Sequence, residues 1–302
     1  MPKPELSIVI VSFNTKELLR HCLLSLKKER NDINYEVMVV DNASSDGSSQ
    51  MVNNKFPWVK LIKSTKNIGF GAGNNLAKHY VNGKYILFLN SDTTIPKYTL
   101  KKTVNYMNSH KQVGALTCKI ILPSGEIDKD TRRSFITPWT GLVHLFLRLD
   151  RIFPESKYFA RYWYGYIPDY LEHEVDVIQG AFFLTRKKLL DELGWFDEDY
   201  FLDGEDVDLC WRIKQKGWNI VYYPKISITH FKGASKGKVE SVRKKDIPLR
   251  SKLKFRMAGV DSMEIFYKKR LWNQYPLLMN FLVLFGIKAI KTQRLLRTIL
   301  LG

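Results

Sequence analysis

The chain has 302 residues, 45% of them hydrophobic and 26% charged, a composition typical of folded globular proteins and unlike that of disordered chains. It carries 48 Lys and Arg against 30 Asp and Glu, and this net charge of +18 indicates an anionic partner: nucleic acid, a membrane surface or a phosphorylated ligand. Residues 240–302 hold 14 basic and four acidic residues, so the rest of the chain is only mildly basic.

The cysteines and the apolar runs indicate where in the cell the protein is located. Cys22, Cys118 and Cys210 form neither a CxxC pair nor a metal-binding spacing, which favours a reduced, intracellular protein. The first apolar run has no cleavage site of small residues and passes directly into polar residues, so no signal peptide is expected. Residues 277–287 are apolar apart from Asn280, but a membrane span needs about 20 such residues. We therefore expect a cytoplasmic protein without a membrane span.

Strand and helix signals alternate along the chain, as in an α/β protein with a parallel sheet. Apolar, β-branched runs predict strands at residues 7–13, 35–41, 59–64, 84–92 and 113–122, and later ones at 174–186, 218–224 and 226–231. After the first strand, apolar residues recur at helical spacing, with Thr15 as the expected N-cap. A second well-marked helix is expected over residues 205–216.

The regular pattern breaks between residues 123 and 172. A hairpin turn at PSGE begins this segment, and the stretch that follows is rich in Arg, Trp, Tyr and Pro. Irregular segments of this length usually form lids or binding loops. We predict one catalytic domain over residues 1–238 that carries this insertion, followed by a basic helical segment at 239–302.

Polar residues follow several of the predicted strands, at the edge where open parallel sheets bind their ligands. Ser12 and Phe13 end the first predicted strand, Asp41 ends the second and Asp92 ends the fourth. The segment 67–75 has glycine at alternate positions, which allows a backbone to approach a ligand closely. A shared ligand crevice is expected there, although turn or helix capping remains an alternative for both aspartates.

Two further segments contain candidate catalytic or metal-binding residues. Glu205, Asp206 and Asp208 begin a helix after an aromatic and acidic loop, and partly buried carboxylates near a cleft are candidate general bases. Acidic residues also suit the first turn of any helix, so a purely structural role stays open. His230 ends a strand, where it is either a metal ligand or a structural side chain.

Taken together, the motifs resemble glycosyltransferase family 2, whose members have the GT-A fold, a Rossmann-like, mixed but mostly parallel sheet flanked by helices. The resemblance covers about residues 5–235 and is strongest to the rhamnosyltransferase branch, in which the stretch at 133–139 also recurs. The residues that carry it lie at 11–14, 39–48, 67–75, 89–92, 180–181, 196–198 and 205–212.

The resemblance implies a role for each motif. Asp206 would be the catalytic base of an inverting transferase, and Glu205 beside it is expected to raise the pKa of Asp206 by like-charge repulsion. Asp41 would hold the pyrimidine ring, and Asp92 and His230 would bind Mg²⁺ or Mn²⁺. The remaining residues implied to line the donor site are Val11, Ser12, Phe13, Asn67, Gly69, Gly71, Asn90, Gly180 and Ala181. The neutral Asn90 stands where the family has the first Asp of Asp-x-Asp, which predicts weaker metal binding.

The substrates follow from the same resemblance. The donor would be a nucleoside diphosphate sugar, with thymidine diphosphate rhamnose implied by the branch and uridine diphosphate sugars left open. The acceptor would be a hydroxyl of a glycan or lipid-linked glycan in cell-surface polysaccharide synthesis. One alternative is a nucleotidyltransferase, but the N-terminal turn offers only Lys16 for clamping phosphates. Another is a nucleic-acid-binding protein, and no motif of that class is present.

The C-terminal segment combines charge and apolar residues. Lys268, Lys269 and Arg270 precede an aromatic stretch and the apolar residues 277–287, and Lys288, Lys291, Arg294 and Arg297 follow. Cationic flanks and interfacial aromatics predict a segment that lies in the headgroup region, peripheral on the inner face of the cell membrane. A helix packed on the catalytic domain, or a homodimer interface, is the alternative, so monomer and homodimer both stay open.

Overall fold

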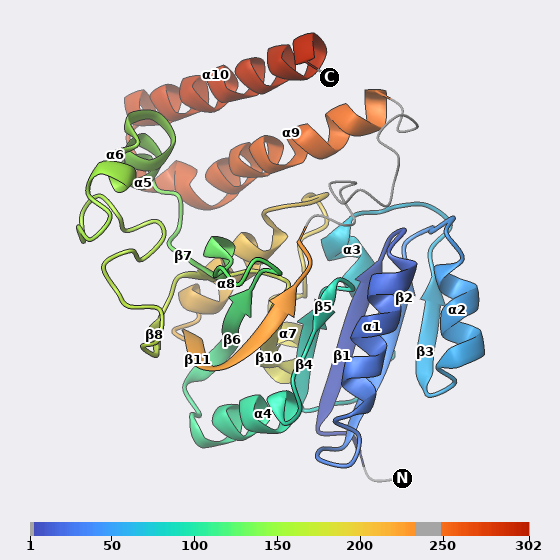
Figure 1. Ribbon diagram of the computed structural model, residues 1–302. Coiled ribbons are helices and arrows are strands. Elements are labelled where there is room, and N and C mark those ends of the chain that lie inside the picture. The colour runs from blue at the N-terminus through green and yellow to red at the C-terminus, as the bar shows by residue number, and fades with distance from the viewer. Residues whose placement is uncertain (1–2, 233–248, 302) are drawn as a thin grey trace.

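A central sheet with helices on both faces forms the body of the protein, and two C-terminal helices lie across one end of it (Figure 1). This is a computed structural model that describes residues 3–232 and 249–301, so the predicted domain boundary at 238 lies outside the described residues. The strands are β1 (Leu6–Ser12), β2 (Tyr35–Asp41), β3 (Val59–Lys63), β4 (Tyr85–Leu89), β5 (Thr93–Thr94), β6 (Val113–Ile121), β7 (Arg132–Arg133), β8 (His173–Glu174), β9 (Val177–Ile178), β10 (Phe182–Arg186) and β11 (Asn219–His230).

The helices follow the strands in a βα alternation over the first half of the chain. They are α1 (Lys16–Lys27), α2 (Ser48–Lys55), α3 (Phe70–Asn75), α4 (Thr99–Ser109), α5 (Pro138–Gly141), α6 (Leu149–Ile152), α7 (Lys187–Leu193), α8 (Glu205–Gln215), α9 (Leu249–Phe266) and α10 (Leu277–Leu301). Short 3₁₀ or π turns are η1 (Lys129–Thr131), η2 (Leu142–Leu147), η3 (Tyr267–Leu271) and η4 (Trp272–Gln274).

The sheet is mixed and mostly parallel, as predicted. Its order is β3-β2-β1-β4-β10-β6-β11-β5, with β8 paired to β11 outside this path. β1 pairs in parallel with β2 and β4, whereas β10 lies antiparallel between β4 and β6. β7 and β9 form a separate antiparallel pair. Because β1, β2 and β4 run in the same direction, the loops that follow them gather at one edge of the sheet.

Alternate residues of the buried strands pack into two apolar layers, one on each face of the sheet. On β1, Ile8 and Ile10 join the layer beneath α1, while Val9 joins the layer beneath α7 and α8. Both layers are closed to water, which is why these strands read as continuous apolar runs in the sequence. The second layer also contains Val260 of α9 and Ile287 of α10, so the C-terminal helices share its core.

Four sequence expectations about the elements need correction. The strand expected at 174–186 is three short strands, because β8, β9 and β10 each pair with a different partner. The two strands expected at 218–231 are one strand, β11, whose register along β6 shifts between Tyr223 and Ser227, around Pro224. The strand expected at 84–92 ends at Leu89. Thr15 occupies the N-cap of α1 without capping it, since its hydroxyl bonds Ser91 instead.

The C-terminal segment is helical, as expected. α9 packs against α8 and shares the apolar layer on that face of the sheet, and α10 packs on α9. Both helices lie beyond the end of the sheet at which β1 and β2 finish (Figure 1). Among the described residues, no helix combines the length and apolar character needed to cross a membrane.

Candidate active site

A cavity of about 1570 Å³ opens at the carboxyl edge of the sheet and extends toward α9 and α10. Its walls come from the loops after β1, β2 and β4, from the 123–146 segment, from the start of α8 and from the end of β11. Eleven of the fourteen site residues predicted from the sequence line it: Val11, Phe13, Asn67, Gly69, Asn90, Asp92, Gly180, Ala181, Glu205, Asp206 and His230. The fold therefore brings together residues that lie more than 200 positions apart in the chain.

Ser12, Asp41 and Gly71 stand outside that lining. The carboxylate of Asp41 accepts hydrogen bonds from the backbone N–H of Ser44, at 3.3 Å, and from the Ser49 hydroxyl, so it organises the loop after β2. A methyl group at Gly71 would lie 3.3 Å from Cβ of Glu205, so this glycine lets α3 pack closely against α8. Direct contacts of these three residues with a nucleotide remain predictions.

Asn42 holds the glycine-rich loop in place. Its amide nitrogen donates to Asn67 Oδ1 and to the Gly69 carbonyl, both at 3.0 Å, and its amide oxygen accepts from the Ile68 N–H at 3.0 Å. Gly69 has φ +93°, and a methyl group there would lie 2.2 Å from the Phe201 carbonyl oxygen. Only glycine fits this position, which fastens the loop to the segment that leads into α8.

Asp206 is a buried carboxylate with one cationic partner. Arg133 Nη2 donates to Asp206 Oδ2 at 2.9 Å, while Asp206 Oδ1 accepts from the Val207 N–H at 2.8 Å. Burial raises the pKa of Asp206 above its ordinary value, and the guanidinium of Arg133 opposes this rise. The carboxylates of Asp203 and Asp130 add to this rise in the pKa of Asp206. The contribution of Glu205 expected from the sequence stays a prediction.

The turn before α8 sets the direction of Asp206. Asp203 has φ +63° and Gly204 φ +144°, so two consecutive residues adopt positive φ immediately before the helix starts. A methyl group at Gly204 would lie 2.6 Å from Cβ of Ser262 on α9. Because only glycine permits that contact, α9 packs directly against the turn that presents Glu205 and Asp206 to the cavity.

Asp92 and His230 meet at the far side of the cavity, with Asp128 behind them. His230 Nε2 lies 3.3 Å from Asp92 Oδ1, and His230 Nδ1 lies 3.3 Å from Asp128 Oδ2. Lys232 Nζ donates to Asp128 Oδ1 at 2.7 Å and also pairs with Asp130. Although burial opposes it, hydrogen bonds to Asp128 and Asp92 raise the pKa of His230 to about 9. The imidazole is therefore a cation near pH 7 in this arrangement.

The side chains of Asp92 and His230 are the candidate ligands for the divalent ion that the resemblance implies. Nowhere in 3–232 or 249–301 do three His, Cys, Asp or Glu side chains form a group that could hold a metal alone. Asp92 and His230 Nε2 nevertheless face each other, and Asp128 fixes the opposite ring nitrogen, as carboxylates do behind metal-bound histidines. Mg²⁺ typically takes one or two carboxylates and completes its shell with water and phosphate oxygens. These residues fit such an ion, provided that His230 releases its proton.

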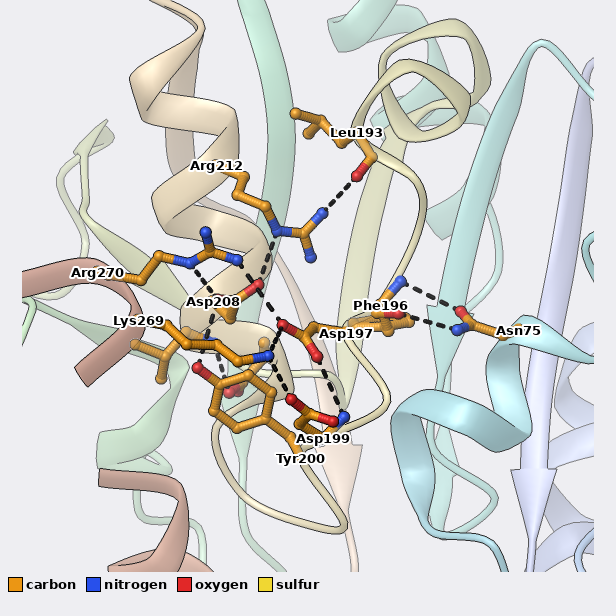
Figure 2. A network of polar contacts seen from close by, with 12 residues as sticks. Asn75, Leu193, Phe196, Asp197, Asp199, Tyr200, Asp208, Arg212, Lys269 and Arg270 are labelled. Atoms are coloured by element: carbon orange, nitrogen blue, oxygen red, sulfur yellow. Dashed lines mark hydrogen bonds and ion pairs between the residues drawn. The ribbon is translucent and has the colours of Figure 1, made fainter. Parts of the chain in front are cut away.

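Asp208 has a structural role, two residues beyond the candidate base. Its side chain is fully buried and accepts from Arg212 Nε at 2.7 Å and from Arg270 Nε at 2.6 Å (Figure 2). Lys269, next to Arg270, pairs with Asp197 and Asp199 at 2.6 Å each. The expectation that Lys269 and Arg270 face anionic lipid is therefore wrong, because acidic groups of the catalytic region already hold both cations. They anchor the C-terminal helices to α8 instead.

Among the residues of this site that were not predicted from the sequence as site residues, Arg133, Asp128 and Asn42 make the contacts described above. Arg133 and Asp128 belong to the irregular insertion, and their partners lie 73 and 102 positions away. Only the recurrence of residues 133–139 in the resembling branch pointed toward Arg133. Asn42 directly follows Asp41, but nothing in its local sequence separates loop support from ligand contact.

Sequence comparisons identify relatives with known names. The chain is 27% identical over 249 residues to the N-acetylglucosaminyl-diphospho-decaprenol L-rhamnosyltransferase of Mycobacterium tuberculosis, covering 77% of this chain and 78% of that protein. It is 26% identical over 232 residues to rhamnosyltransferase WbbL of Escherichia coli, covering 74% and 82% of the two chains.

Solved structures share the fold at low identity. A mannosyltransferase of Pyrobaculum calidifontis, solved with GDP-mannose and Mn²⁺, superposes with a TM-score of 0.55 at 18% identity, over 88% of this chain and 65% of that one. TarS of Staphylococcus aureus (residues 1–349) gives a TM-score of 0.52 at 17% identity, over 90% and 74%. At these identities the likeness establishes the GT-A fold alone.

The family model described as glycosyl transferase family 2 matches residues 7–194, more than half of the chain, including the loops after β1, β2 and β4 and the segment that carries Arg133. This match favours sugar transfer over the nucleotidyl transfer considered from the sequence. The chain therefore belongs to glycosyl transferase family 2 and is a glycosyltransferase.

Proposed function

We propose that the protein inverts the anomeric centre as it moves a sugar, rhamnose in the first instance, from a nucleoside diphosphate to a lipid-linked glycan. The process served would be synthesis of cell-surface polysaccharide. The observation that carries the proposal is the buried Asp206–Arg133 pair, which lines the same cavity as the Asp92–His230 pair. The names of the two relatives support the choice of substrates, because both are rhamnosyltransferases and one is named for a diphospho-decaprenol acceptor.

Proton removal is the task of Asp206 in this mechanism. An acceptor hydroxyl is a weak nucleophile, so a carboxylate must take its proton as the hydroxyl attacks. Asp206 Oδ2 accepts a hydrogen bond from Arg133, whose positive charge opposes the rise in the pKa of Asp206 that burial causes and so favours the ionised form that accepts the proton. A single displacement needs no enzyme nucleophile, and one displacement at the anomeric carbon inverts its configuration.

The leaving diphosphate requires positive charge. Asp92 and His230 would hold Mg²⁺ or Mn²⁺, which as a Lewis acid neutralises the charge that develops on the leaving group. Asp128 would keep His230 Nε2 directed at the ion, and the loop held by Asn42 would bring backbone groups close to the nucleotide. Such a site would take the ion more readily as pH rises, because His230, whose pKa is raised, would first have to lose its proton.

The experiment that tests this function measures transfer and its stereochemistry. A thermal-shift screen of thymidine and uridine diphosphate sugars with Mn²⁺ identifies the donor, since a ligand that binds only the folded state raises its unfolding temperature. The selected donor is then incubated with N-acetylglucosaminyl-diphospho-decaprenol, and the product is examined by NMR. We expect one added sugar of opposite anomeric configuration to the donor. A retained configuration, or release of nucleotide with no glycoside formed, would contradict the proposal.

We also infer that α10 rests on an anionic membrane surface. Its first half exposes Leu277, Leu278 and Phe281, and Lys288 follows on the same helix. Interfacial helices combine an exposed apolar face with basic residues, and each cation near an anionic leaflet contributes about 1 kcal/mol. This placement would bring the cavity to a lipid-linked acceptor.

Flotation with anionic vesicles tests the membrane contact. The wild-type protein should float at low salt, whereas Leu278→Asp combined with Phe281→Asp should remain with the soluble fraction. The matched control, Leu24→Asp with Tyr80→Asp, adds the same charge at partly exposed apolar residues elsewhere and should float normally. Deletion of the C-terminal helices is a poor test because it would also remove Arg270 from Asp208. Equal flotation of both double variants would refute the contact.

A further inference from the structure

The cavity continues past the catalytic residues into an apolar groove. The groove runs between the α5–η2 segment and α10, and α9 lies at its base. Its apolar lining includes Leu142 and Phe146 from the insertion, Phe266 from α9, and Leu282, Phe285 and Ile287 from α10. Pockets for one small ligand usually enclose about 300–1,000 Å³. The total of about 1570 Å³ therefore leaves room beyond a nucleotide sugar.

The two walls of the groove approach each other at a glycine. A methyl group at Gly286 of α10 would lie 3.1 Å from Cζ of Phe146, so the absence of a side chain lets the aromatic ring approach the helix. Figure 1 shows the α5–α6 segment beside the first half of α10, far along the chain from it. Leu142, Phe146, Leu282 and Phe285 are all exposed while lining the cavity, so the groove is open to the surface on its apolar side.

Arg294 of α10 lies at the end of the groove that is nearer to the catalytic residues. Arg294 of α10 lines the cavity, and a methyl group at Gly259 would lie 3.8 Å from Arg294 Nη1 and 3.7 Å from Asp203 Oδ2. Arg294 is thus close to the turn that presents Asp206. Within the described ranges, no carboxylate forms an ion pair with its guanidinium. Along the cavity, the candidate base Asp206 comes first, followed by Arg294, then by the apolar groove and finally by the exposed apolar face of α10.

That order matches a sugar joined through a diphosphate to an isoprenoid chain. We propose that the groove between α5–η2 and α10 binds the isoprenoid chain of the acceptor, and that Arg294 contacts its diphosphate. The inference rests on the proposed function, since it names the part of the lipid-linked acceptor that the protein holds. The guanidinium can pair with phosphate oxygens, and the groove removes the first isoprene units from water.

The test measures lipid binding separately from sugar transfer. The probe is decaprenyl diphosphate with a fluorescent label at its far end, in neutral detergent micelles, and polarisation reports its binding to the full chain. Hexyl diphosphate serves as the short-chain competitor. Leu282→Glu should weaken probe binding at least about tenfold, because a carboxylate in the groove opposes burial of the chain. Leu296→Glu is the matched control: both leucines are on α10 and similarly exposed (59% and 52%), but only Leu282 lines the groove.

A second pair of variants separates the chain from the diphosphate. Arg294→Gln should weaken binding of both decaprenyl and hexyl diphosphate by about tenfold, the loss expected when a charge-assisted hydrogen bond is removed. Arg151→Gln on α6, an exposed arginine outside the cavity lining, should bind both like wild type. Unfolding temperatures of all four variants confirm that each is folded.

Several results would overturn the groove assignment. Equal weakening by Leu282→Glu and Leu296→Glu would mean that α10 meets lipid only as a general apolar face. Equal wild-type affinity for decaprenyl and hexyl diphosphate would exclude a bound chain. Unchanged probe binding by Leu282→Glu, with loss of a dimer in sedimentation, would assign the face to a second copy of the protein. Failure of sugar transfer from every donor would refute the proposed function while leaving these binding results intact.

Discussion

Asp206→Asn is expected to lower kcat by at least about 100-fold while donor affinity stays near the wild-type value. The amide cannot accept a proton from the attacking hydroxyl, and Asp206 takes no part in holding the nucleotide in the proposed mechanism. The shape of the side chain is retained, so the contact with Arg133 keeps a hydrogen-bond acceptor. Initial rates at saturating donor, together with donor affinity from the thermal-shift titration, measure the two quantities.

Two neighbouring carboxylates provide the controls for this result. Glu205→Gln changes an adjacent residue that lines the same cavity and should leave more activity than Asp206→Asn. Asp208→Asn should mainly reduce the unfolding temperature, since Asp208 is buried between Arg212 and Arg270. If Asp206→Asn turns over normally while Glu205→Gln does not, the base is Glu205.

Removal of the divalent ion should abolish transfer, and excess Mn²⁺ or Mg²⁺ should restore it. The same loss is expected for Asp92→Ala with either ion, because its carboxylate is the one acidic donor proposed for the metal. His230→Ala should have a weaker defect that added metal rescues, since water can replace a single imidazole. Activity of the purified protein in EDTA, titrated back with each ion, gives the comparison.

A metal-independent mechanism would give different results in the same experiments. The raised pKa of His230, about 9, favours a cationic imidazole near pH 7, and such a cation would neutralise a diphosphate directly, without a metal. In that case activity would persist in excess chelator, and His230→Ala would be at least as damaging as Asp92→Ala. Deprotonating His230 at high pH would then lower the rate, whereas a metal site would be strengthened by the same loss of a proton.

The sheet and its polar edge could be predicted because the signals are local. Each parallel strand is an apolar run, and the loop after it begins with polar residues such as Asn42 or Asp92. Pairings across long separations could not be predicted, since nothing near Arg133 indicates that Asp206 will be its partner. The role of Lys269 and Arg270 was mistaken for a related reason: a basic cluster looks the same in sequence whether lipid or protein carboxylates lie opposite it.

The spacing of Asp206 and Asp208 constrains how the enzyme can diversify. One turn of α8 carries both the proposed base and the anchor for the C-terminal helices. Removing one partner of a buried ion pair typically costs about 3–5 kcal/mol, much of the net stability of an ordinary domain. The groove-facing residues of α10 take no part in the ion pair between Arg270 and Asp208. They can therefore change during evolution to fit new acceptors, whereas Arg270 cannot. A chimaera that exchanges C-terminal segments between relatives should therefore place its junction after residue 270.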